Sequence, residues 1–227
     1  MSDPAGKTYL VVGASSGIGA SVSRLLAARR ATVILAARDA GRLEETLRSL
    51  APGDHVLAPL DACDLGAIPS HVETLRSRHG VIDGMVYCVG VGVTARLRDL
   101  APADMEYALR GNCSAFVEFV RCLVRRKPRE QWFQAVGISS LASIDNEKYL
   151  TAYAAGKAAM EAAIRCLATE LGGRRVRLNA VRPGFVDTPR LAVVDALAEG
   201  GVGRHFVESG YQPLGLIHPD DVAAMAL

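Results

Sequence analysis

The chain has 227 residues with 26 basic and 24 acidic side chains, which gives a formal net charge of only +2. This balance excludes the strong positive field that nucleic acids and anionic membranes select, so we expect neither as a partner. Half of the residues are hydrophobic, which indicates one globular domain over residues 1–227 with a substantial core.

Short apolar runs alternate with amphipathic segments along the whole chain. The expected strands cover residues 9–12, 31–37, 55–58, 84–89, 132–138 and 176–181. The expected helices cover residues 18–30, 39–50, 68–79, 102–124 and 151–171. Strands and helices that alternate at this rate are typical of βαβ units with right-handed crossovers. We therefore predict an α/β fold with a single Rossmann-type, doubly wound parallel sheet of order 3-2-1-4-5-6 and helices on both faces.

Three glycines, Gly13, Gly17 and Gly19, separate the first expected strand from the first helix. Their G-x-x-x-G-x-G spacing differs from the G-x-G-x-x-G spacing of the common dinucleotide fingerprint. Glycines let a backbone approach a phosphate, and a helix N-terminus presents N–H groups and the positive end of its dipole. The stretch is a candidate phosphate site, although a plain strand-to-helix turn could have the same composition.

The end of the second expected strand bears on the choice of nucleotide. Many dinucleotide folds place an acidic residue there to bind the adenosine ribose 2′-OH, but this chain has the neutral Ala37 followed by Arg38. A guanidinium suits a 2′-phosphate, which a carboxylate would repel. We therefore predict NADP rather than NAD as the cofactor. The alternative is that Arg38 is a solvated residue after the strand.

A second group of polar residues follows the fifth expected strand. Ser140 lies at its carboxyl end, where ligands of such sheets bind, and can donate a hydrogen bond to a substrate carbonyl. Tyr153 and Lys157, four positions apart, share one face of the next helix. A lysine cation beside a phenol stabilises the phenolate, so we expect the pKa of Tyr153 to fall from about 10 towards neutrality. A Tyr-x-x-x-Lys pair alone is usually structural, but with Ser140 and the glycine turn it indicates proton transfer.

With these motifs the chain resembles the short-chain dehydrogenases/reductases over nearly its whole length. The matching residues are V-G-A-S-S-G-I-G at 12–19, Asp61, Gly90, Asn112, Ser140, Tyr153, Lys157 and R-P-G-F-V-D-T at 182–188. The resemblance implies NADPH-dependent reduction of a ketone or aldehyde to an alcohol by hydride transfer. Two alternatives stay open: an NADP-binding regulatory or scaffolding protein without catalysis, and an epimerase or lyase that uses the same tyrosine.

The resemblance also implies a role for each matching position. Tyr153 would be the general acid/base, Lys157 would lower its pKa and hold the nicotinamide ribose, and Ser140 would orient the carbonyl. Asn112 would hold a water that links Lys157 to solvent, unless it is an ordinary polar residue of its helix. The implied NADP site comprises Gly13, Ser15, Ser16, Gly17, Ile18, Gly19, Arg38, Asp61, Ala62, Gly90, Tyr153, Lys157, Pro183, Gly184, Val186 and Thr188. The dispersed histidines and cysteines predict no metal site.

Three features depart from the family pattern. Val12 stands where the family usually has threonine, and residues 87–90 read Tyr-Cys-Val-Gly where it commonly has Asn-Asn-Ala-Gly. Side-chain bonds that brace the sheet would therefore be lost, and we expect Cys88 to pack rather than to react. The sequence stops at Leu227, before the family's last strand, so the sixth strand would become a sheet edge.

The remaining predictions concern the substrate, the assembly and the compartment. Residues 189–215 fall where the family has its substrate lid, with Gly200, Gly201, Gly203 and Gly210 as candidate hinges. Candidates for the substrate wall are Ile144, Tyr149, Phe185 and Phe206. The apolar faces of the helices around 103–123 and 154–167 predict a homodimer. Five scattered cysteines and no apolar run of membrane-spanning length predict a reduced, cytoplasmic protein.

Overall fold

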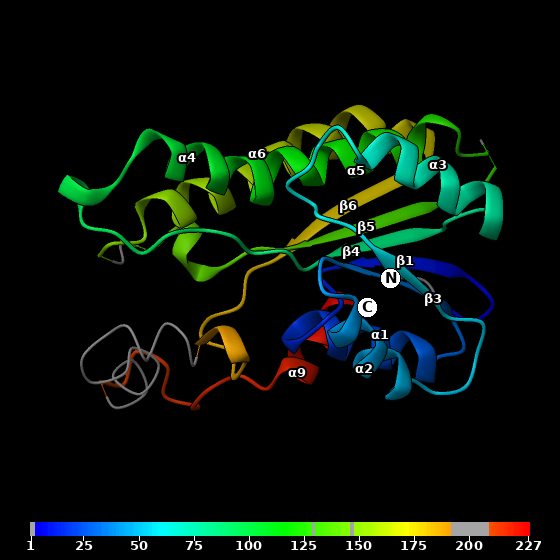
Figure 1. Cartoon of the computed structure of the whole chain (residues 1–227), viewed down its shortest axis with the longest axis horizontal. Helices are drawn as coiled ribbons and strands as arrows, with labels where there is room; N and C mark the ends of the chain where they lie inside the picture. The colour runs from blue at the N-terminus through cyan, green and yellow to red at the C-terminus, as the bar shows by residue number, and fades with distance from the viewer. Residues whose placement is uncertain (1–2, 129, 146–147, 192–208) are drawn as a thin grey trace.

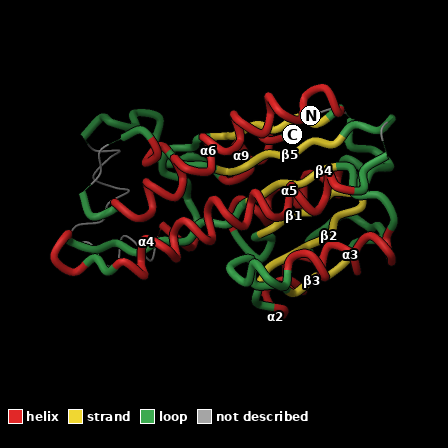
Figure 2. The backbone as a smooth tube through the Cα atoms, turned by 90° about the horizontal axis from the view of Figure 1, so that it is seen from above, coloured by secondary structure: helices red, strands yellow, loops and turns green. Residues whose placement is uncertain are grey.

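The structure is a computed structural model that describes residues 3–128, 130–145, 148–191 and 209–227. It confirms the predicted fold class, a six-stranded parallel sheet of order β3-β2-β1-β4-β5-β6, seen from above in Figure 2. The strands are β1 (Thr8–Val12), β2 (Thr32–Ala37), β3 (Val56–Pro59), β4 (Gly84–Tyr87), β5 (Phe133–Ile138) and β6 (Val176–Val181).

Helices cover both faces of this sheet (Figure 1). One layer contains α1 (Gly17–Ala28), α2 (Ala40–Arg48) and α9 (Pro219–Ala226). The opposite layer contains α3 (Ile68–His79), α4 (Pro102–Leu109), α5 (Ala115–Arg125) and α6 (Thr151–Leu171). Each layer seals its own hydrophobic cluster against the sheet. The central strand β1 contributes to both clusters, because alternate residues of a strand point to opposite faces, and this explains its unbroken apolar sequence.

The strand order reverses at β1, and this reversal determines where on the sheet a ligand can bind. From β1 the chain first moves outward to β2 and β3, and then returns to add β4 on the other side of β1. Val12 at the end of β1 is in register with Ala36 of β2 and Tyr87 of β4. The segments that follow β1 and β4 therefore diverge from one point, the crevice where open α/β sheets bind ligands.

The helix predicted over residues 102–124 is interrupted. Between α4 and α5 the backbone forms a π-helical segment, Arg110–Ser114, a feature that often marks functional sites. Asn112 lies inside it, fully buried, and its side-chain amide donates to the carbonyl oxygens of Ala108 (2.8 Å) and Val91 (2.6 Å). Its Oδ1 accepts from the Val91 N–H at 3.2 Å. This segment is only five residues long, too short to disturb the apolar periodicity of the helices on either side, so the pattern predicted one continuous helix.

The last described elements pack against the first ones. Helix α9 lies beside α1, and a single parallel bridge joins Val186 to Ile217. Within the described residues β6 forms one edge of the sheet, as predicted. None of the described helices has both the length and the apolarity that crossing a bilayer would require.

Candidate active site

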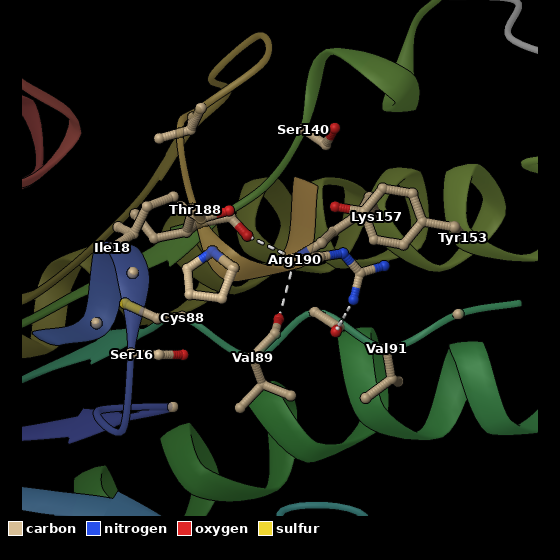
Figure 3. Close-up of a pocket in the computed structure, with 18 of the residues that line it drawn as sticks. Ser16, Ile18, Cys88, Val89, Val91, Ser140, Tyr153, Lys157, Thr188 and Arg190 are labelled. Atoms are coloured by element: carbon tan, nitrogen blue, oxygen red, sulfur yellow. Dashed lines mark hydrogen bonds between the residues drawn. The ribbon is translucent and has the colours of Figure 1, made fainter. Parts of the chain in front are cut away.

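A pocket of about 540 Å³ lies at the carboxyl ends of β1, β4 and β5, and Figure 3 shows part of its lining. Every residue of the implied NADP site lines it, and so does Ser140. Of the four residues with an implied catalytic role, only Asn112 does not reach the pocket wall. The structure thus gathers residues that are up to about 175 positions apart in the sequence.

The glycine turn forms the floor at one end of this pocket. Gly13 and Gly17 have φ angles of +88° and +49°, which favour glycine. A Cβ at Gly19 would lie 2.0 Å from the carbonyl oxygen of Gly13, so no side chain fits there. Ser16 precedes α1 without a side-chain cap bond, which leaves the first N–H groups of the helix available to an anion. The turn therefore fits the pyrophosphate of a dinucleotide.

Two arginines line the pocket where β2 ends. Arg38 follows β2, and Arg42 lies one turn into α2. The Asp39 carboxylate between them accepts a hydrogen bond from the Arg42 N–H at 3.1 Å and so caps α2. Asp61, after β3, likewise accepts from the Cys63 N–H at 2.9 Å. The side chains available to a phosphate at this end are cations, while both carboxylates already bind backbone.

Lys157 is 2% exposed and joins the ends of β4 and β5. Its Nζ donates to the carbonyl oxygens of Val89 (3.0 Å) and Ile138 (2.6 Å). Burial, aided by the nearby cation of Arg190, lowers the pKa of Lys157 to about 7. The lysine therefore changes charge near neutral pH, beside the Tyr153 ring, whose centre is 5.8 Å from Nζ.

Tyr153 and Ser140 flank this lysine (Figure 3). Tyr153 is the third residue of α6 and is half-buried, and the loop after β4 passes close against it. A Cβ at Gly92 would lie only 2.8 Å from the Cβ of Tyr153. Ser140 ends the extended stretch after β5, and its Oγ accepts from the Ala142 N–H at 3.3 Å. The hydroxyl hydrogen of Ser140 is left to donate to a ligand.

A buried carboxylate braces the segment that carries Ser140. Glu161, one turn after Lys157 in α6, accepts hydrogen bonds from the hydroxyls of Ser139 and Ser143 and from the guanidinium of Arg182. Burial by itself would raise the pKa of Glu161, but these bonds outweigh it and lower the pKa to about 2. The ionised carboxylate therefore ties the end of β5 to α6 and to the end of β6.

The unusual residues at the end of β4 take part in packing. The Tyr87 hydroxyl donates to the carbonyl oxygen of Gly111 in the π-helical segment, and its ring meets Phe116 edge-on at 5.7 Å. This contact provides a brace where the expected asparagines are missing. Burial raises the pKa of Cys88 to about 12, as expected for a packed thiol.

Sequence reasoning missed three charged residues that line the pocket: Asp39 and Arg42 at the adenosine end, and Arg190 beside Tyr153. The Nη1 of Arg190 donates to the carbonyl oxygen of Gly90 at 2.6 Å, and its Cζ lies 4.8 Å from the centre of the Tyr153 ring. No motif identifies it, because Arg190 falls in the predicted lid, where an arginine has no expected partner. Only the fold brings residues 90, 153 and 190 together.

Of the residues predicted to form the substrate wall, one lines the pocket and two described ones do not. Phe185 lines the pocket. Ile144 and Tyr149 are 63% and 49% exposed and do not line it. The remaining wall candidate and most of the proposed hinges (Phe206, Gly200, Gly201 and Gly203) lie outside the described residues. Gly210, the fourth hinge candidate, has a φ angle of +76°.

Comparison with known proteins places this geometry in a family. A family model described as enoyl-(acyl carrier protein) reductase matches residues 13–227. The 3-oxoacyl-[acyl-carrier-protein] reductase FabG of Thermotoga maritima is 31% identical over 186 residues, which are 81% of this chain and 76% of that protein. The fatty acyl-CoA reductase of Acinetobacter baylyi is 28% identical over 191 residues, which are 82% of this chain and 65% of that protein.

Solved structures agree with these sequence matches. A dehydrogenase/reductase from Sinorhizobium meliloti superposes with a TM-score of 0.87 at 26% identity, covering 97% of this chain and 86% of that one. A 3-oxoacyl (acyl-carrier-protein) reductase from Agrobacterium tumefaciens with NADP bound superposes with a TM-score of 0.84 at 28% identity, covering 98% of this chain and 86% of that one. The chain therefore belongs to the short-chain dehydrogenase/reductase family and is an NAD(P)-dependent oxidoreductase.

Proposed function

We propose that this protein reduces the carbonyl group of a small ketone or aldehyde to an alcohol with NADPH. The observation that carries the proposal is the placement of Ser140, Tyr153 and Lys157 along one pocket whose other end is the glycine turn. A purely NADP-binding protein would have no need of a hydroxyl, a phenol and a buried lysine at the substrate end. The similarity to proteins named ketoacyl and acyl-CoA reductases supports the same reaction type.

The nucleotide we propose is NADP. Arg38 and Arg42 line the adenosine end, and the nearest carboxylate, that of Asp39, is engaged as a helix cap. A guanidinium pair can bind the charged 2′-phosphate, whereas no carboxylate is available there to select a 2′-hydroxyl. The NADP in the similar Agrobacterium tumefaciens structure supports this choice.

The chain's own residues then divide the chemistry. When bound, the nicotinamide supplies the hydride that reduces the carbonyl carbon. Ser140 donates a hydrogen bond to the carbonyl oxygen, and Tyr153 gives that oxygen its proton. In its protonated form Lys157 has three N–H donors and uses two on the carbonyl oxygens of Val89 and Ile138, so the third can hold a ribose hydroxyl. The glycine turn and Arg38 hold the phosphates.

The water relay implied for Asn112 stays a prediction. Its side-chain Nδ2 already donates to the carbonyl oxygens of Val91 and Ala108, and its Oδ1 accepts from the Val91 N–H. In our proposal a water that links Lys157 to solvent would therefore bind backbone groups of the π-helical segment. Asn112 itself would fix the loop after β4 against that segment.

The reaction class is tested by adding a panel of carbonyl compounds to the protein and NADPH. We expect stoichiometric loss of NADPH absorbance together with formation of the alcohol. Product without net loss of NADPH would instead indicate an epimerase or lyase. NADPH binding without any product would favour the regulatory or scaffolding alternative, and either result would contradict the reductase.

Replacing Arg38 by serine tests the nucleotide preference. We expect the Kd for NADPH to rise about 10- to 100-fold, because charge-assisted hydrogen bonds contribute about 1.5–3 kcal/mol. The Kd for NADH, which has no 2′-phosphate, should change by less than about threefold. Fluorescence titration of both nucleotides measures this. Arg78→Ser, at an exposed position of α3 outside the pocket, is the matched control, and equal loss for both nucleotides in Arg38→Ser would contradict the assignment.

We also propose a homodimer through α4, α5 and α6, and a cytoplasmic location. The side of α6 away from the sheet carries small residues that are exposed or half-exposed, among them Ala155, Ala159 and Ala162. Tyr107 and Leu109 of α4 are each 38% exposed. Small side chains allow two helices to approach closely, so this surface suits the same helices of a second copy.

A further inference from the structure

Among the described residues, the substrate end of the pocket is lined by positive charge without a matching carboxylate. Lys157 and Arg190 are the charged side chains that line it near Tyr153. The two acidic residues among the described lining residues, Asp39 and Asp61, follow β2 and β3 at the adenosine end. Both already accept backbone hydrogen bonds. An anion at the substrate end would therefore be attracted by Arg190, and by Lys157 where it is protonated, and would meet no repulsion from a described lining carboxylate.

Arg190 is placed to make direct contact with such an anion. It is exposed, and none of the ion pairs among the described residues includes it. Its guanidinium lies between the Tyr153 ring and the loop after β4 (Figure 3). One N–H group binds the Gly90 carbonyl oxygen at 2.6 Å. A guanidinium has five N–H donors in a planar fork, so several remain for a ligand.

The neighbouring lysine shows that the two cations affect each other. Burial is the main cause of the lowered pKa of Lys157, and the positive charge of Arg190 lowers it further. A negative group bound at Arg190 would reduce this repulsion. Exchanging the neutral carbonyl for a carboxylate would also give the guanidinium an oppositely charged partner that can accept two parallel hydrogen bonds.

Building on the proposed function, we propose that Arg190 is a specificity-determining residue that binds the carboxylate of an oxo-acid substrate. Tyr153 fixes where the reacting carbonyl oxygen lies, and the guanidinium is stacked on the ring of that same tyrosine. The carboxylate must then be close to the carbonyl along the carbon chain, as in 2-oxo and 3-oxo acids. On binding, Arg190 would exchange the Gly90 carbonyl for the substrate carboxylate.

The test compares 3-oxobutanoate and 2-oxobutanoate with their methyl esters, which keep the carbonyl but lose the charge. In the wild-type protein we expect kcat/KM with NADPH to be at least about tenfold higher for the acids. Arg190→Met should lower kcat/KM for the acids about 10- to 100-fold more than for the esters. Arg190→Lys keeps the charge but loses the planar fork, so it should fall in between. Arg177→Met, an exposed arginine on β6, is the control for net charge.

A binding measurement keeps this inference separate from the reductase proposal. The shift in melting temperature of the NADP⁺-saturated protein is recorded with each acid and each ester, with and without Arg190→Met. A shift with the acids that Arg190→Met removes would support the anion site even if no carbonyl is reduced, and only the reductase proposal would then fail. Equal shifts for acids and esters, no shift with any of them, or equal losses of kcat/KM for acids and esters in Arg190→Met would overturn the role of Arg190.

Discussion

Replacing Tyr153 by phenylalanine is expected to lower kcat by about 10²- to 10⁴-fold, the range that a positioned general acid contributes. The change removes only the hydroxyl that we propose protonates the carbonyl oxygen. The ring keeps its contacts with the loop at Gly92 and with the Arg190 guanidinium, so the pocket should hold its shape. The Kd for NADPH should therefore rise by less than about tenfold, since at most one hydrogen bond is lost. Steady-state kinetics and fluorescence titration measure the two effects separately.

Tyr149→Phe is the matched control for this experiment. Tyr149 is 49% exposed and does not line the pocket, although it lies only four positions before Tyr153. We expect it to keep wild-type kcat. A Tyr153→Phe variant that turns over at the wild-type rate would show that another group supplies the proton, and would contradict the mechanism. A variant that loses NADPH binding as well would show a structural role instead.

Replacing Lys157 by methionine is expected to change how stability depends on pH. The folded-state pKa of Lys157 is about 7, below its ordinary value of 10.5. Between these values the unfolded chain binds one more proton, so the free energy of unfolding of the wild-type protein rises with pH. Each pH unit is worth about 1.4 kcal/mol. From pH 7 to pH 9 the wild-type protein should therefore gain about 2 kcal/mol more than Lys157→Met, as measured by urea unfolding.

Lys148→Met provides the control, because it removes the same positive charge from an exposed position. Its stability should follow the wild-type pH dependence. Below pH 7 the lysine is protonated in both states, so the cost of burying the cation is fully present and the curves should run parallel. Coincident curves for the wild-type protein and Lys157→Met from pH 7 to pH 9 would contradict the buried ammonium.

Much of the fold could be predicted because its elements are encoded locally. The predicted ranges 151–171 and 176–181 coincide with α6 and β6, since one ends at a glycine and the other is a short apolar-alternating run. Other bounds shifted by one or two residues where a cap or a turn ends the element, as Asp39 does for α2. The π-helical segment at Arg110–Ser114 could not be predicted, because a side chain from outside the helix, that of Tyr87, binds its carbonyl at Gly111.

The candidate site divides in the same way. Glycines at positive φ, a Tyr-x-x-x-Lys pair and a serine after a strand are recognisable because each depends on near neighbours. Parallel strands end at one edge of the sheet, so these motifs meet in one pocket without further information. The Glu161–Arg182 pair and the contact of Arg190 with Gly90 join positions 21 and 100 residues apart. No spacing rule relates residues that far apart.

The sequence by itself therefore determined most strands and helices and the glycine turn after β1, because periodicity and short motifs act within a strand or a helix turn. The sheet order and the residues proposed for proton transfer followed from the resemblance to a known family. Only the tertiary structure decided that Tyr87 braces the π-helical segment, that Lys157 is buried enough to change charge near neutral pH, and that Arg190 stacks on Tyr153. Desolvation and charge proximity depend on which distant segments pack together, and that arrangement exists only in the folded chain.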